Sequence, residues 1–202
     1  ADVHKVFQQI TGMGKKIHPN LLIHAPFNLK KSLLKMIAEE AAAAEAGKEA
    51  RIVAKLNALT DSEMIRALYE ASNAGVKVDL IVRGMCCLRP GIEGVSENIR
   101  VVSIIGRFLE HSRVYYFKNS EQQLYCSSAD WMERNLSNRI EVCFPILKKK
   151  HQSRILAEIE WHLEDEIQCW ELGADGEYTK IQHATTQESA QGVQQRLLEK
   201  LA

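Results

Sequence analysis

The chain has 202 residues and no net formal charge, because 26 basic residues balance 26 acidic ones. A protein that coats DNA or RNA is normally basic, so this balance argues against nucleic acid as a partner. Hydrophobic residues make up 46% and charged residues 26%, which excludes a disordered chain and a coiled-coil rod. No apolar run reaches the roughly 20 residues that a membrane-spanning helix needs, and no signal peptide opens the chain. We expect a globular domain cut from a longer protein, because the chain begins with Ala1.

The cysteines indicate the compartment. There are five, an odd number, and none forms a CxxC pair or a zinc-like spacing with histidine. We therefore expect free thiols in a reducing cytoplasm. Association of the intact protein with a membrane is left open.

Arginine is concentrated in the middle of the chain. Seven of the 11 arginines, and one of the 15 lysines, lie between Arg83 and Arg139. Arginine is favoured where a planar fork must bind carboxylate or phosphate. The cluster indicates an anion site there, and ordinary surface ion pairs are the alternative.

The first half of the chain alternates helical and strand patterns. Asn28 and Asp61 are good N-caps for the two longer helices, and Gly75 marks the end of the second. In chain order we expect a short helix over 3–10, a glycine-containing loop over 11–20, a strand over 21–24, a helix over 29–48, a strand over 51–56, a helix over 61–73 and a strand over 77–82.

Strands cluster in the second half, so the expected fold class is α/β with a mixed sheet flanked by helices. Apolar residues at four-residue spacing from Ile155 to Ile167 predict a long helix, and the tail after Gly173 resembles an irregular arm. In chain order we expect a loop over 84–96, a strand over 99–105, paired strands over 113–117 and 123–127, a strand over 140–147, a helix over 151–170 and a last helix over 187–202.

Polar and cationic side chains follow the expected strands where they end. Ligands of open α/β sheets bind at the carboxyl ends of strands. We therefore expect His24, Lys55, Arg83, His111 and Arg113 to meet in one cleft. The other polar residues at these ends are Asn28, Asn57, Arg89, Arg107, Glu110, Ser127, Ser128, Asp130, Arg134 and Asn135.

The segment His111-Ser112-Arg113 favours phosphoryl chemistry. Residues two apart on an extended segment point the same way, so the imidazole and the guanidinium share one side. A histidine beside a fixed cation can act as a nucleophile, as a general acid or as a donor to a phosphate oxygen. A histidine that is simply hydrogen-bonded in a loop is the alternative.

A His-x-Lys/Arg motif followed by a serine-rich turn and a nearby Asp or Asn is the pattern of the phospholipase D-like superfamily. More specifically, residues 24–34, 50–117 and 127–147 closely resemble the C-terminal part of bacterial polyphosphate kinase. The strings CCLRPG (86–91), GRFLEHSR (106–113) and SSADWMERNL (127–136) carry this resemblance, which weakens after about Leu172.

The resemblance implies a phospholipase D-like domain of an enzyme that reversibly transfers the terminal phosphate of ATP to polyphosphate. ATP, ADP and polyphosphate would be its ligands, and the other domains of a homo-oligomeric polypeptide its partners. The phosphohistidine would form on the preceding domain, which would also hold Mg²⁺. The division implied is a connecting segment over 1–20, the phospholipase D-like domain over 21–172, and a C-terminal arm and helix over 173–202.

Two residues match the family's functional positions. Arg83 corresponds to the arginine that contacts ATP phosphates, and His111 to the second essential histidine, the catalytic residue of this chain. Arg113 would add charge, Lys55 and Asn57 would be secondary phosphate binders, and no metal ligand is expected. The sequence leaves open a phospholipase D-like phosphodiesterase, although the chain has a single His-x-Arg motif, and a non-catalytic binding module.

Overall fold

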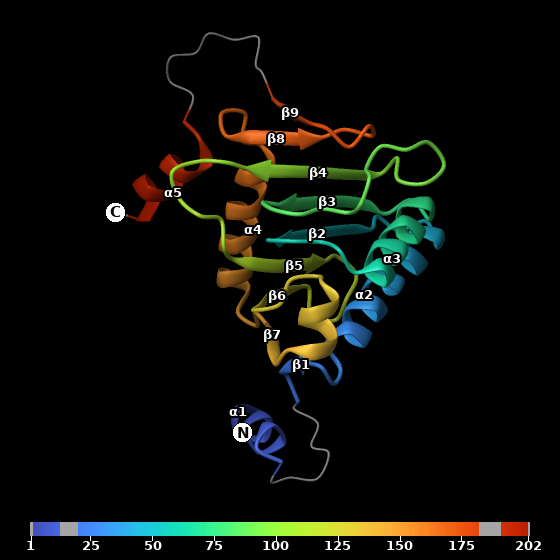
Figure 1. Cartoon of the computed structure of the whole chain (residues 1–202), viewed down its shortest axis with the longest axis vertical. Coiled ribbons are helices and arrows are strands. Elements are labelled where there is room, and N and C mark those ends of the chain that lie inside the picture. Colours follow the sequence, from blue (N-terminus) through green and yellow to red (C-terminus); the bar gives the residue numbers. More distant parts are fainter. Residues whose placement is uncertain (1, 13–19, 182–190, 202) are drawn as a thin grey trace.

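The computed structural model describes residues 2–12, 20–181 and 191–201. Within these residues one nine-stranded sheet has the order β1-β7-β6-β5-β2-β3-β4-β8-β9 (Figure 1). β2, β3 and β4 are parallel, and all other neighbours are antiparallel, which confirms the expected mixed sheet. The strands are β1 (Ile23–Ala25), β2 (Arg51–Leu56), β3 (Lys77–Val82), β4 (Ile99–Ile104), β5 (Arg113–Phe117), β6 (Leu124–Ser127), β7 (Glu141–Pro145), β8 (Cys169–Leu172) and β9 (Tyr178–Lys180).

Helices cover both faces of the sheet, because the central strands are apolar on both sides. Along β2, Ile52 and Ala54 belong to the core that includes α2 and α3, whereas Val53 belongs to the core that includes Ile159 of α4. Successive strand residues point to opposite faces, which explains this alternation. Figure 1 shows α2 and α3 together and α4 away from them. The helices are α1 (Asp2–Ile10), α2 (Leu29–Glu45), α3 (Ser62–Asn73), α4 (Lys149–Leu163) and α5 (Val193–Leu201), with a π-helical turn, η1, at Arg134–Asn138.

The capping signals explain most of the helix boundaries. Asp61 Oδ1 accepts hydrogen bonds from the amides of Glu63 and Met64, both at 3.1 Å, which confirms it as the N-cap of α3. Gly75 follows α3 with φ at +95°, a conformation that favours glycine. Asn28 precedes α2, but its side chain accepts from the amide of His24 at 2.9 Å instead of capping the helix.

The expected long helix over 151–170 is wrong in its last part. α4 ends at Leu163, and the Asp165 carboxylate accepts hydrogen bonds from the amides of Ile167 and Gln168. This turn redirects the chain into β8, which pairs antiparallel with β4. Ile167 continues the four-residue apolar spacing by coincidence, since it is 42% exposed.

The C-terminal part is more ordered than an irregular arm. β9 pairs with β8 at the edge of the sheet, and Val193 of α5 belongs to the core around α4. The expected last helix is confirmed over Val193–Leu201, whereas 187–190 lie outside the described residues. Most of the expected loop over 11–20 also lies outside them.

Candidate active site

A cleft of about 620 Å³ opens at one edge of the sheet, where several strand ends meet. The parallel strands β2 and β3 end at this edge, β5 begins there, and β6 ends there. The topology therefore brings together segments that lie far apart in the sequence. The described residues that line the cleft are Asn57, Ala58, Arg83, Gly84, Met85, His111, Arg113, Ser128, Asp130, Met132, Arg134, Asn135, Arg139 and Glu141.

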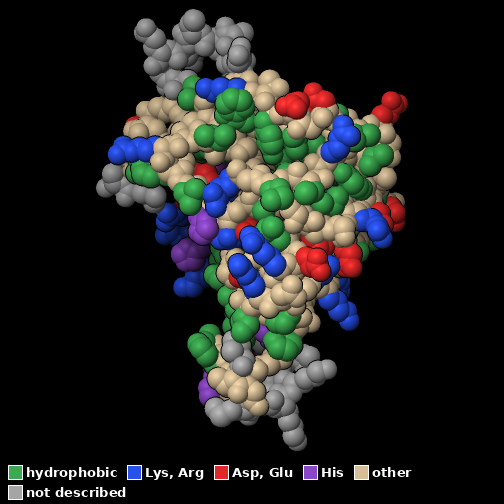
Figure 2. All heavy atoms as spheres, viewed as in Figure 1, with side chains coloured by type: hydrophobic (Ala, Val, Ile, Leu, Met, Phe, Trp, Pro, Cys, Tyr) green, Lys and Arg blue, Asp and Glu red, His purple; other side chains and the backbone are tan. Residues whose placement is uncertain are grey.

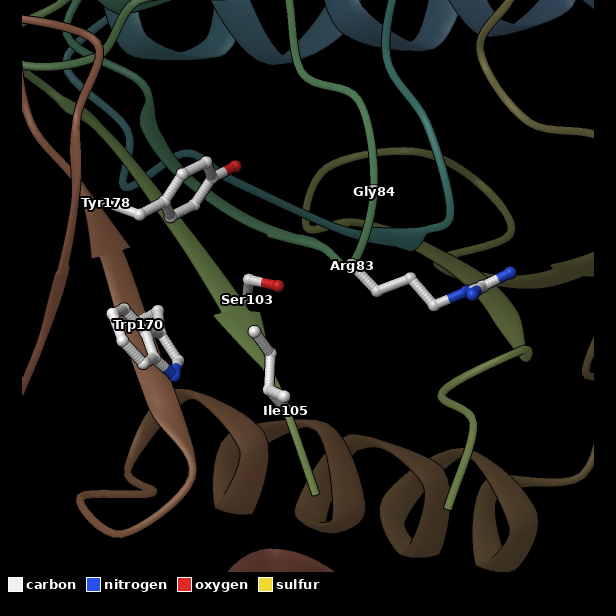
Figure 3. Close-up of a pocket in the computed structure, with 6 residues that line it drawn as sticks. All are labelled: Arg83, Gly84, Ser103, Ile105, Trp170 and Tyr178. Atoms are coloured by element: carbon white, nitrogen blue, oxygen red, sulfur yellow. The ribbon is translucent and has the colours of Figure 1, made fainter. Parts of the chain in front are cut away.

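Arg83 and His111 face each other across this cleft. Arg83 Nε donates to Asn57 Oδ1 at 2.7 Å, and Arg83 Nη2 lies 3.5 Å from His111 Nδ1. A guanidinium has no acceptor, so a hydrogen bond at this contact would use a lone pair on Nδ1 and leave the imidazole proton on Nε2. Figure 3 shows the Arg83 side chain extending away from a smaller pocket of about 220 Å³ beside Trp170 and Tyr178. The guanidinium is therefore available to the larger cleft.

Asp130 anchors the floor of the cleft. Its carboxylate receives two parallel bonds from Arg113, Nε at 3.1 Å and Nη2 at 3.0 Å, and one from the backbone amide of Asn57 at 2.7 Å. Burial raises the pKa of Asp130, but these hydrogen bonds outweigh it and hold the pKa below its usual value. Arg113 Nη1 also donates to the carbonyl of His111 at 3.1 Å, so Arg113 ties the histidine to the floor.

Three cleft arginines carry charge that the protein does not neutralise locally. Within the part of the chain that the structure describes, Arg83, Arg134 and Arg139 make no ion pair. Asp79 and Glu110 are carboxylates that could have paired with Arg83, but Asp79 pairs with Arg51 at 2.8 Å and Glu110 with Lys55 at 2.9 Å. Figure 2 shows Lys and Arg side chains gathered beside a histidine on the displayed face. The cleft is therefore suited to a polyanion.

The expectation that five polar or cationic side chains meet in the cleft holds for Arg83, His111 and Arg113 but is wrong for Lys55 and His24. Lys55 lies inside β2 on the face that packs against α4, and its side chain is 4% exposed. Burial lowers the pKa of Lys55, and the ion pair with Glu110 opposes that shift. His24 lies on β1 at the outer edge of the sheet, where Nε2 is 2.9 Å from Gln9 Oε1.

Sequence reasoning missed one acidic member of the cleft. Glu141 begins β7 and is buried, and its carboxylate receives hydrogen bonds from Asn135 Nδ2 at 2.7 Å and from the Ser128 hydroxyl. These bonds tie η1 to β6 and β7 beside Arg134 and Arg139. Its only signal in the sequence was its place near the start of the strand expected over 140–147.

Glu110, next to His111, is the centre of a second polar cluster. Its carboxylate accepts from Lys55 Nζ at 2.9 Å, His162 Nε2 at 3.1 Å and Gln194 Nε2 at 2.8 Å. Burial raises the pKa of Glu110, but the bonds from His162 and Gln194 and the charge of Lys55 outweigh it and lower the pKa to about 2.

This shift predicts an acid-sensitive contribution to stability. A carboxyl whose pKa falls from 4.5 to about 2 on folding stabilises the fold fully above pH 4.5, and this contribution is lost as the pH falls toward 2. We expect Glu110→Gln to flatten the decline of the free energy of unfolding in that window, whereas Glu133→Gln, at an exposed site, leaves it unchanged. Urea unfolding across the window measures this. Equal slopes for Glu110→Gln and the wild type would contradict it.

The described residues contain no cluster of three or more His, Cys, Asp or Glu side chains placed to hold a metal ion. We therefore assign none of the described residues to a metal site. Among the described helices, none is long and apolar enough to cross a membrane. All five cysteines are free thiols, as expected.

The fold of the chain resembles that of a phospholipase D family member. The crystal structure of Nuc from Salmonella typhimurium, a phospholipase D family member, aligns with a TM-score of 0.52 at 14% identity, covering 75% of this chain and 96% of that one. An identity this low shows a shared fold alone. It confirms the expected mixed sheet flanked by helices, without bearing on the chemistry.

The sequence comparisons define the family. The model of the polyphosphate kinase C-terminal domain 2 matches residues 22–192, and the chain belongs to this family. It is 58% identical over 202 residues to polyphosphate kinase from Pseudomonas aeruginosa strain PAO1, and spans 29% of that protein's length. The crystal structure of polyphosphate kinase from Porphyromonas gingivalis aligns with a TM-score of 0.92 at 33% identity, covering 99% of this chain and 31% of that one. The expected family is therefore confirmed.

Proposed function

We propose that this chain is the catalytic C-terminal domain of a polyphosphate kinase that reversibly transfers the terminal phosphate of ATP to polyphosphate. The observation that carries the proposal is the pairing of Arg83 with His111, with Nη2 and Nδ1 3.5 Å apart, in a cleft whose arginines exceed its carboxylates. Phosphoryl transfer needs mainly positioning and neutralisation of charge on oxygen, and this cleft offers both.

Arg83 and His111 have complementary roles in the proposal. Asn57 holds Arg83 through Nε, which leaves the terminal nitrogens to bind phosphate oxygens as a fork. His111 offers its Nε2 proton to the oxygen that leaves phosphorus, and in the reverse reaction that nitrogen takes the proton back. Asn57 thus acts by orienting Arg83.

The remaining candidate residues support this pair. Arg113 adds positive charge and holds the His111 carbonyl at 3.1 Å. Lys55 acts through Glu110 from beneath the cleft, at 2.9 Å, so its contribution to phosphate binding is electrostatic. Arg134 and Arg139 line the cleft and extend its positive surface, as a polyphosphate path requires.

The rest of the polypeptide completes the reaction. The resemblance supports a phosphohistidine on the preceding domain, with ADP as the product of the first step and a homo-oligomeric, cytoplasmic enzyme as its setting. In this division of labour, the nucleophile attacks the γ-phosphorus, the bond from that phosphorus to the ADP oxygen breaks, and Arg83 and His111 of this chain stabilise the transferred group and the leaving oxygen.

The test is ATP-dependent polyphosphate synthesis by the full-length protein. We expect the terminal phosphate of labelled ATP to appear in acid-insoluble polyphosphate, and ATP to form again from ADP and polyphosphate. Release of phosphate from a phosphodiester, without polyphosphate synthesis, would instead support a phospholipase D-like phosphodiesterase. Binding of polyphosphate without turnover would support a binding module.

The same division of labour predicts that this chain alone is inactive. Incubation of the isolated 202-residue chain with ATP and magnesium should give no acid-labile phosphoprotein, because His111 is not the nucleophile. The full-length protein, treated in parallel as the positive control, should become labelled. Stoichiometric phosphohistidine on the isolated chain would overturn this assignment of roles.

A further inference from the structure

The last helix contacts the loop that carries His111. The loop over 105–111 connects β4 to β5, and Gln194 of α5 binds it through both ends of its side-chain amide. Gln194 Oε1 accepts from the backbone amide of Phe108 at 2.9 Å, and Nε2 donates to the carbonyl of Phe108 at 2.7 Å. The same Nε2 donates to Glu110 Oε1 at 2.8 Å. One side chain therefore fixes both Phe108 and the residue before His111.

Gly106 makes this close approach possible. A Cβ at position 106 would lie 2.5 Å from Gln194 Oε1 and 2.1 Å from Gln168 Nε2. Real contacts of this kind do not occur, so any other residue at 106 would displace the two amides. The loop and α5 are therefore matched in shape as well as in hydrogen bonding.

The other restraints on the loop are polar: Arg113 donates to the carbonyl of His111 at 3.1 Å, and the amide of Ile105 donates to the carbonyl of Gln168 at 2.9 Å. Ile105 and Leu109 are 61% and 68% exposed, so apolar burial contributes little to its position. On its inner side Glu110 is held by Lys55 from β2 and by His162 from α4. His162 Nδ1 lies 2.7 Å from the carbonyl of Glu158 and Nε2 lies 3.1 Å from Glu110, so both ring nitrogens face acceptors.

We propose that Gln194 is a positioning residue for His111. It holds the loop at Phe108 and Glu110 so that His111 Nδ1 faces Arg83 and Nε2 faces the cleft. The inference rests on the proposed function, since it gives the C-terminal helix a role in the same reaction. Gln194 lies beyond residues 22–192, to which the family model extends. A misplacement of a catalytic group by about 1 Å can cost on the order of 100-fold in rate.

The decisive variant is Gln194→Leu in the full-length protein. Leucine fills similar space but removes all three hydrogen bonds. We expect kcat for polyphosphate synthesis to fall about 10- to 100-fold with little change in KM for ATP, because the loop acts on the transition state. We also expect faster hydrogen exchange in the peptide over 105–111, measured by mass spectrometry. The matched control is Gln195→Leu, because Gln195 is exposed and contacts Glu199 within its own helix.

Two further variants separate positioning from stability. Gly106→Ala disturbs the same contact from the side of the loop, because the added Cβ would displace the Gln194 amide. It should reproduce the loss in kcat. Gln194→Glu keeps the acceptor for Phe108 but replaces the donor to Glu110 with a second carboxylate, whose charged and titratable neighbours are Glu110, Lys55 and His162. Its activity relative to wild type should rise as the pH falls, because the protonated carboxyl can again donate. When kcat is expressed per folded molecule, a side chain that only stabilises the fold would give no such pH profile.

The outcomes distinguish this inference from the proposed function. If His111→Ala abolishes synthesis but Gln194→Leu matches Gln195→Leu in kcat and in exchange over 105–111, Gln194 has no positioning role. The inference is also overturned if exchange rises throughout the chain and kcat per folded molecule is unchanged. If the wild type makes no polyphosphate, the proposed function fails. If, in addition, Gln194→Leu leaves hydrogen exchange over 105–111 unchanged, the contact between Gln194 and the loop is rejected as well.

Discussion

Replacement of His111 with alanine should reduce kcat for polyphosphate synthesis by about 100- to 10,000-fold in the full-length protein, the usual contribution of a general acid. Alanine removes the imidazole that lines the cleft, including the Nδ1 atom 3.5 Å from Arg83 Nη2. His111 is exposed, so the melting temperature should stay close to that of the wild type. Initial rates of synthesis and thermal unfolding, recorded on the same preparations, measure both.

The control for His111→Ala is His151→Ala, which removes an exposed histidine from the start of α4. It should leave kcat and the melting temperature unchanged. His111→Gln retains a hydrogen-bond donor but cannot release a proton at neutral pH. We expect it to recover part of the rate if His111 mainly stabilises charge, and none if proton transfer dominates. Wild-type kcat for His111→Ala would remove His111 from the mechanism.

Substitutions of Arg83 should lower kcat/KM in steps, less for lysine than for alanine, because the shape of the guanidinium matters as well as its charge. Lysine keeps the charge, but a single ammonium cannot both bond to Asn57 Oδ1, as Arg83 Nε does at 2.7 Å, and offer a two-pronged fork to phosphate. A charge-assisted hydrogen bond is worth roughly 1.5–3 kcal/mol, so Arg83→Lys should lower kcat/KM about 10- to 100-fold. Arg83→Ala should cost more, because phosphate charge then has no partner.

The fold should survive both Arg83 variants, since Arg83 makes no ion pair with a described residue. Arg66→Ala, which removes an exposed arginine from α3, is the matched control and should leave kcat/KM unchanged. A loss of activity that parallels a loss of melting temperature, with normal kcat/KM per folded molecule, would make Arg83 a structural residue instead.

The sequence predicted the centre of the sheet well, because local signals and tertiary packing agree there. β2 and β3 are mostly apolar and lie between clear turn signals, and their bounds match the expected 51–56 and 77–82. The topology then dictates that residues after both strands share one edge. Asn57 and Arg83 could therefore be placed in one cleft before the structure was known.

Predictions failed where the outcome depended on which face or edge a residue occupies. Lys55 was assigned to a strand end, yet its position inside β2 directs it to the face beneath α4. The apolar spacing through Ile167 favoured a longer helix. In the structure Asp165 instead accepts hydrogen bonds that form a turn into β8, and no sequence signal indicates this role. Local periodicity cannot resolve such competition between a helix and a sheet edge.

The C-terminal helix could not be linked to the cleft from the sequence alone. Gln194 lies 86 residues from Phe108 and is one of several glutamines in a polar stretch with no motif. Only the packing of α5 beside α4 brings it to the loop. Side chains that position another residue leave only a weak pattern in the sequence, because any side chain of the right length with a donor and an acceptor could make the same hydrogen bonds.

The central claim is that phosphate binds between Arg83 and His111, and a structure of the full-length protein with a non-hydrolysable ATP analogue tests it most directly. We expect oxygens of the analogue's phosphates to lie about 2.7–3.2 Å from the Arg83 guanidinium and from His111 Nε2. The adjoining loop over 105–111 should keep its contact with Gln194. A complex in which the phosphates lie outside this cleft, with Arg83 and His111 touching neither them nor the leaving oxygen, would contradict the account.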